Sequence, residues 1–110
     1  MADTYAFTAG KNVYDSETVT VSSSAISLTT SKVDNHSRVL GSRSKAAAAI
    51  IQPTANGFYY TLDGSTPSSS NGAVVAAGEV LALAGYSKIK KLKMIRSGAS
   101  DAVVHVDYYN

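Results

Sequence analysis

Two pairs of histidine and aspartate are the residues whose types and spacing could do chemistry. His105 lies two residues before Asp107, so in a strand the two side chains share one face and could touch. With a nearby serine, such a pair would imitate a hydrolytic triad. Alternation of outward polar residues on a half-buried strand explains the same pattern without catalysis, and no Gly-x-Ser-x-Gly turn exposes a nucleophile. We therefore expect a protein that is not an enzyme.

Metal binding has as little support in the sequence. His36 and Asp34 form the second pair, and His105 with Asp107 offers no third ligand. Asp63 lacks the alternating acidic companions of a calcium loop, so its predicted task is to cap its own turn. Because the chain has no Cys, thiolate metal sites and disulfides are excluded. We expect neither a metal nor another cofactor.

The overall charge and hydropathy narrow the partners. The 110 residues carry a formal net charge of +2, which is too weak to argue for nucleic acid. A basic run at 88–96 is interpreted as a solvated strand face that discourages edge pairing, while contact with an acidic protein surface stays open. The chain begins without signal-peptide features, and its longest apolar run, 46–51, is too short for a bilayer. We expect a protein made in the cytoplasm that does not engage a membrane.

Alternating residues and turn signals predict an all-β chain. Phe58, Tyr60 and Leu62 share one strand face before Asp63-Gly64 turns the chain and Pro67 ends the pairing. Asn56-Gly57 predicts a hairpin turn in front of that strand. The other predicted strands are 17–21, 26–28, 46–51 (with a helix as the open alternative), 74–75, 80–83, 89–96 and 102–108.

These elements predict one domain with an arm. Seven or eight short strands separated by Gly, Ser, Asn and Pro indicate a small antiparallel β-sandwich, either immunoglobulin-like or jelly-roll-like. Residues 1–15 are interpreted as an N-terminal arm and 16–110 as the sandwich domain. Within the domain, 31–45 has few apolar residues and is interpreted as a long surface loop.

Tyrosine is the remaining candidate for contacts, since it combines a large contact area with a polar tip. There are seven. In each of two adjacent pairs, alternation sends one ring inward and one outward. We expect Tyr60 and Tyr108 in the core and Tyr59 and Tyr109 on a contact surface.

The segment Phe58-Tyr59-Tyr60-Thr61-Leu62-Asp63-Gly64-Ser65-Thr66-Pro67 resembles the signature of small immunoglobulin-like domains appended to chitobiases and bacterial surface proteins. A second resemblance covers 17–110 and is to small virion proteins of tailed bacteriophages. It is carried by the strand at 19–29, the Asp63-Gly64 turn, Ala76-Ala77-Gly78-Glu79, Leu81-Ala82-Leu83, the basic 88–96, and Gly98-Ala99-Ser100-Asp101-Ala102 before the aromatic end. The arm and a long loop at 34–45 depart from that pattern.

The second resemblance implies a structural protein of the virion that decorates or cements the capsid or sits at the head–tail region. Its partners would be the major capsid protein or head–tail subunits, in many copies or as a homo-oligomer, and nucleic acid is not favoured. The alternative is a carbohydrate-binding or adhesive immunoglobulin-like module. The residues predicted to contact partners are Tyr5, Phe7, Val13, Tyr14, His36, Arg38, Arg43, Tyr59 and Tyr109.

Overall fold

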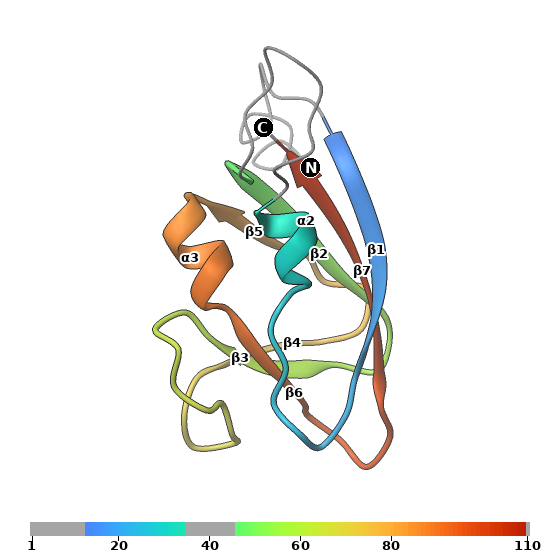
Figure 1. The fold of residues 1–110 in the computed structure, drawn as a ribbon. Coiled ribbons are helices and arrows are strands. Elements are labelled where there is room, and N and C mark those ends of the chain that lie inside the picture. The colour runs from blue at the N-terminus through green and yellow to red at the C-terminus, as the bar shows by residue number, and fades with distance from the viewer. Residues whose placement is uncertain (1–12, 35–45, 110) are drawn as a thin grey trace.

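The computed structural model describes residues 13–34 and 46–109, and Figure 1 shows their arrangement. In chain order the elements are β1 (Val13–Val21), α2 (Thr30–Val33), β2 (Ala48–Ala55), β3 (Phe58–Thr61), β4 (Ala73–Val75), β5 (Leu81–Ala84), α3 (Tyr86–Lys91), β6 (Lys93–Arg96) and β7 (Ala102–Tyr109). Both helices are short, and strands make up most of the regular structure.

The seven strands form two antiparallel sheets. One sheet has four strands in the order β1-β7-β2-β5, and the other has three in the order β4-β3-β6. In Figure 1, β3 and β4 run across the direction of β1 and β7, while α2 and α3 lie beside each other. The prediction of a small all-β sandwich is confirmed.

The core follows from alternation along the central strands. On β7, Val104, Val106 and Tyr108 are fully buried, and the residues between them face outward. Their cross-strand neighbours on β2, such as Ile51 opposite Val106, are buried as well. Burying each such side chain contributes about 1.5–3 kcal/mol. The other sheet supplies Phe58 and Met94, so the two inner faces meet in one core.

The prediction of one strand over 89–96 is wrong, because its first part is helical. Gly85, with φ 108°, precedes α3, and only Lys93–Arg96 form β6. Ile89 and Leu92 are both fully buried, and a spacing of three places them on one helical face. The adjacent Lys90 and Lys91 break strand alternation but suit the exposed side of a helix.

The hairpin predicted at Asn56-Gly57 is also wrong. Asn56 does adopt the left-handed conformation, with φ 61°. However, the turn leads from β2 in one sheet to β3 in the other, so the two strands do not pair. Gly57 is required by a close approach instead, since a Cβ there would lie 2.5 Å from the carbonyl oxygen of Val75.

Three boundaries also differ from expectation. The arm predicted at 1–15 loses its last three residues to β1, where Val13 is paired with Tyr109. The loop predicted at 31–45 begins as α2 and contains the buried Val33. The strand predicted at 26–28 is an isolated bridge, in which Ile26 and Met94 exchange backbone hydrogen bonds of 2.9 and 2.8 Å. The strand predicted at 46–51 exists as β2, which begins two residues later and continues to Ala55.

Candidate interaction surface

Four chain positions meet at one end of the sandwich. The backbone NH of Ala46 donates to the carbonyl of Val33 at 2.9 Å, and that of Ala47 donates to Tyr109 at 2.8 Å. Val13, the first residue of β1, pairs with Tyr109 near the end of β7, as Figure 1 shows. We call this end, formed by Val13, Asp34, Ala46 and Tyr109, the tethering end. The segments 1–12 and 35–45 are therefore both attached here.

The tethering end carries an apolar row on the outward face of the four-stranded sheet. Val13 opposes Tyr109, Tyr109 opposes Ala48, and Ala48 opposes Ala84, so the row crosses all four strands. The Val13 side chain is 52% exposed, and Tyr109 is half-buried. Partial burial, and then the nearby charge of Asp107, raise the pKa of the Tyr109 hydroxyl, so it stays neutral at physiological pH. Two residues predicted to contact partners are thus direct neighbours.

Tyr14, another predicted contact residue, points inward at the same end. Its hydroxyl donates to the backbone carbonyl of Lys32 at 2.6 Å, and its ring lies 6.2 Å from that of Tyr108. The ammonium of Lys32 in turn pairs with Asp15 at 3.0 Å. These contacts fasten α2 to the start of β1.

Glu17 continues this polar layer, and the sequence analysis missed it. Its carboxylate accepts hydrogen bonds from the hydroxyls of Thr29, at 2.6 Å, and Tyr108. Burial and the bond to Glu17 raise the pKa of Tyr108 far above its ordinary value. The signal was present in the sequence, because Glu17 shares its strand parity with Val19 and Val21 and therefore points toward the core.

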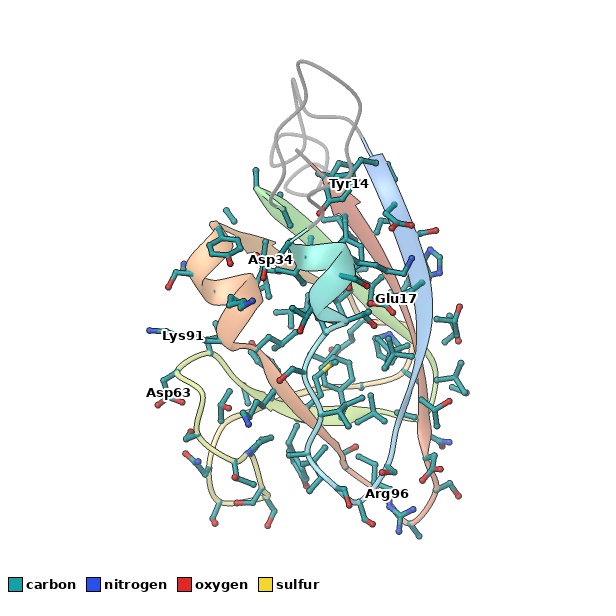
Figure 2. All side chains as sticks on the ribbon, viewed as in Figure 1. Tyr14, Glu17, Asp34, Asp63, Lys91 and Arg96 are labelled. Carbon is teal, nitrogen blue, oxygen red and sulfur yellow. The ribbon has the colours of Figure 1, made fainter. Side chains whose placement is uncertain are left out.

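Asp34 links the two helices and was likewise missed. Its carboxylate accepts hydrogen bonds from the Tyr86 hydroxyl and the Lys90 ammonium, both on α3. The bond to Asp34 is the main cause that raises the pKa of each partner. Figure 2 shows Asp34 between the two helices, with Glu17 on the other side of α2. Both flanks of α2 are therefore held by charged hydrogen bonds.

The remaining predicted contact residues do not join this end. Tyr59 lies on the outward face of the three-stranded sheet, between Val74, which is 56% exposed, and Ile95. Tyr5, Phe7, His36, Arg38 and Arg43 lie outside the described residues. The basic run is divided, since Lys88, Lys90 and Lys91 belong to α3, whereas Lys93 and Arg96 belong to β6.

The two residues with the greatest catalytic potential do touch. The imidazole Nε2 of His105 lies 3.0 Å from a carboxylate oxygen of Asp107 on the exposed face of β7. Ser16 is opposite Asp107, and Thr18 is opposite His105. Within residues 13–34 and 46–109, no serine hydroxyl is hydrogen-bonded to this imidazole, and no three His, Asp or Glu side chains form a potential metal cluster.

The turn at Asp63 begins a loop that its own side chains hold together. One carboxylate oxygen of Asp63 accepts from the backbone NH and the hydroxyl of Ser65, at 3.0 and 2.6 Å, which confirms the predicted cap. The same bonds, the hydroxyl bond foremost, lower the pKa of Asp63. A shallow open hollow lies at the base of this loop. Its lining residues are Tyr60, Thr61, Leu62, Asp63, Asn71, Gly72 and Ala73, and we call it the β3–β4 hollow.

Comparison with known proteins adds no relative to these observations. In the described part of the chain, neither helix is long and apolar enough to cross a membrane. No protein-family model, no curated protein and no solved structure matches the sequence or the fold.

Proposed function

We propose that the protein is a non-enzymatic structural component of a bacteriophage virion that binds neighbouring capsid or head–tail subunits, with capsid decoration or cementing as its role. The observation that supports the proposal best is the tethering end. There the fold gathers the attachment points of two segments, 1–12 and 35–45, and an outward apolar row that includes Val13 and Tyr109.

The base of this end is rigid, which favours binding. The bonds from Tyr14 and Glu17 hold α2 on one side, and Asp34 joins it to α3 on the other. A segment that leaves a fixed base loses less conformational freedom on docking than one that leaves a frayed strand. The tethering end can therefore present its contacts without prior rearrangement.

The residues attached there suit contact with protein. The segment 1–12 contains Tyr5 and Phe7, and 35–45 contains His36, Arg38 and Arg43 but no acidic residue. Aromatic side chains and arginine are enriched where proteins bind each other. In a shell with many copies, each such contact stabilises the assembled state because it is absent from the free subunits.

The experiment is to purify particles by density gradient from the cells that express this gene and to detect the chain in each fraction by mass spectrometry. We expect the protein to sediment with the particles in many copies. Recovery only at the top of the gradient, with free protein, would contradict the proposal.

A matched pair of variants assigns the binding surface. Val13 and Val74 are the two large apolar side chains reported as exposed, at 52% and 56%, and they lie on different sheets. We expect Val13→Asp to deplete the protein from particles at least about tenfold, as one buried unpaired charge costs, and Val74→Asp to leave it in place. The reverse result would move the surface to the three-stranded sheet.

A further inference from the structure

We propose that the β3–β4 hollow binds a neutral saccharide, with a single pyranose ring as the unit that it recognises. The hollow lies at the base of the loop that joins β3 to β4, which Figure 1 places well away from the start of β1 and the end of β7. The inference is therefore independent of the proposed role of the tethering end.

The loop that bounds the hollow is held in one shape before any ligand arrives. The Thr61 hydroxyl donates to the carbonyl of Ser65 at 2.6 Å, and the Asn71 side-chain amide donates to the carbonyl of Thr66 at 2.9 Å. Ser68 and Asn71 exchange backbone hydrogen bonds, and the Pro67 side chain is fully buried. A rigid loop of this kind adds little ordering cost to binding.

Small residues keep the space open. Gly72 has φ +115°, and a Cβ there would lie 2.3 Å from the carbonyl oxygen of Tyr60. No larger side chain can therefore replace this glycine without moving the strand, and Ala73 beside it carries only a methyl group. Tyr60 and Leu62 provide the larger apolar surfaces of the lining.

The polar groups at the hollow are chiefly acceptors. One oxygen of Asp63 is occupied by Ser65, while the other accepts no hydrogen bond from the described residues. The side-chain nitrogen of Asn71 donates to Ser65 and Thr66, and its carbonyl oxygen likewise has no donor among them. Hydroxyl groups of a ligand can supply these donors, as the usual inventory of side-chain hydrogen bonds requires.

Charge separates a saccharide from a cationic ligand. The ammonium of Lys91 is close enough to Asp63 to favour its carboxylate form, and both residues lie on the same side of the molecule in Figure 2. A second cation at Asp63 would be repelled by Lys91, whereas a neutral hydroxyl would not. A pyranose also has a C–H face that suits Tyr60 and Leu62, which matches the common pattern of apolar pockets with a few placed polar groups.

The test is a titration of the full chain, followed by ¹H–¹⁵N correlation spectra, with D-glucose, D-galactose and N-acetyl-D-glucosamine in turn. We expect at least one sugar to shift the amides of 60–63 and 71–73, with a Kd of about 1–10 mM for so shallow a site. No shift of these amides with any of the three sugars would overturn the inference.

Two variants decide whether Asp63 carries the recognition. We expect Asp63→Asn to weaken binding about tenfold, because one acceptor oxygen becomes a donor. Asp107→Asn on the four-stranded sheet should bind like the unchanged chain. If Asp63→Asn retains its folded spectrum and binds as tightly as the control, the site is not the one proposed here.

Discussion

The hydroxyl of Tyr108 donates a hydrogen bond to the carboxylate of Glu17, joining two residues that are 91 positions apart. Tyr108 is fully buried near the end of β7, and Glu17 lies in the middle of β1. Because Thr29 bonds the other carboxylate oxygen, one side chain connects the central strand, the edge strand and the residue before α2. This relationship is the structural basis of the first two predictions.

A double-mutant cycle measures the bond between Tyr108 and Glu17. We expect Tyr108→Phe to lower the free energy of unfolding by about 1.5–3 kcal/mol, the usual value for a hydrogen bond to a charged group. Glu17→Leu should show a coupling with it of about 0.5–3 kcal/mol, since each change removes the same bond. Urea denaturation supplies the four values. Tyr59→Phe is the control, because no hydrogen bond of the Tyr59 hydroxyl is observed in the described part, and it should change stability by less than about 0.5 kcal/mol.

Stability should decrease in alkali. Burial and the bond to Glu17 raise the pKa of Tyr108, and burial also raises that of Tyr109. Above about pH 10 the unfolded chain releases these protons while the folded chain keeps them. The stabilisation is therefore complete below about pH 10 and is lost as the pH rises further.

Denaturation at stepped pH, with tyrosinate absorbance recorded in parallel, checks this direction. We expect a constant free energy of unfolding below about pH 9 and a decline above about pH 10, with a shallower decline in Tyr108→Phe. Ionisation of every tyrosine near pH 10 in the folded protein would contradict the prediction.

Much of this framework could be predicted from the sequence, because alternation determines which face of a half-buried strand is inside. On 102–108 the pattern correctly placed Val104, Val106 and Tyr108 in the core. The same rule could have found Glu17, but it was not applied to a charged residue. Polar side chains on the inward parity of an edge strand are informative because they need a partner when buried.

The errors arose where a local pattern fits two structures. The apolar residues of 86–92 fit a short helical face, and Leu92 and Met94 also fit a strand, so parity alone could not locate the end of α3. Asn56-Gly57 specifies a turn but not the sheet that the next strand joins. The pairing of Val13 with Tyr109 depends on tertiary contacts, so the boundary of the arm and the tethering end could not be derived from composition.

The link between the helices predicts a local effect of Lys90. Lys90→Met removes one donor to Asp34, so α2 and α3 should open more often. We expect faster hydrogen exchange at the amides of Val33 and Ile89, which are bonded to Thr29 and Gly85. Lys88→Met on the same helix is the matched control and should leave both amides unchanged. Equal exchange in the two variants would show that Lys90 does not hold the helices together.

The turn between the sheets predicts a backbone effect at Gly57. In Gly57→Ala the new methyl group would lie 2.5 Å from the carbonyl oxygen of Val75, so the strand must shift. We expect a loss of about 1–3 kcal/mol in the free energy of unfolding, as for other overpacked positions. A Cβ at Gly98 meets nothing within 4 Å, so Gly98→Ala should be neutral or stabilising by up to about 1 kcal/mol. Thermal and urea unfolding of both variants would measure this difference.

Truncation separates the attached segment from the sandwich itself. Removal of 1–12 leaves every residue of β1 in place, whereas removal of 1–15 deletes the pairing of Val13 with Tyr109, the Tyr14 hydroxyl and the Asp15 partner of Lys32. We therefore expect the shorter deletion to retain the urea midpoint and the longer one to lower it. If the proposed role is correct, the shorter deletion should still reduce sedimentation with particles. Unchanged sedimentation of a folded 13–110 chain would show that the segment 1–12 makes no necessary contact.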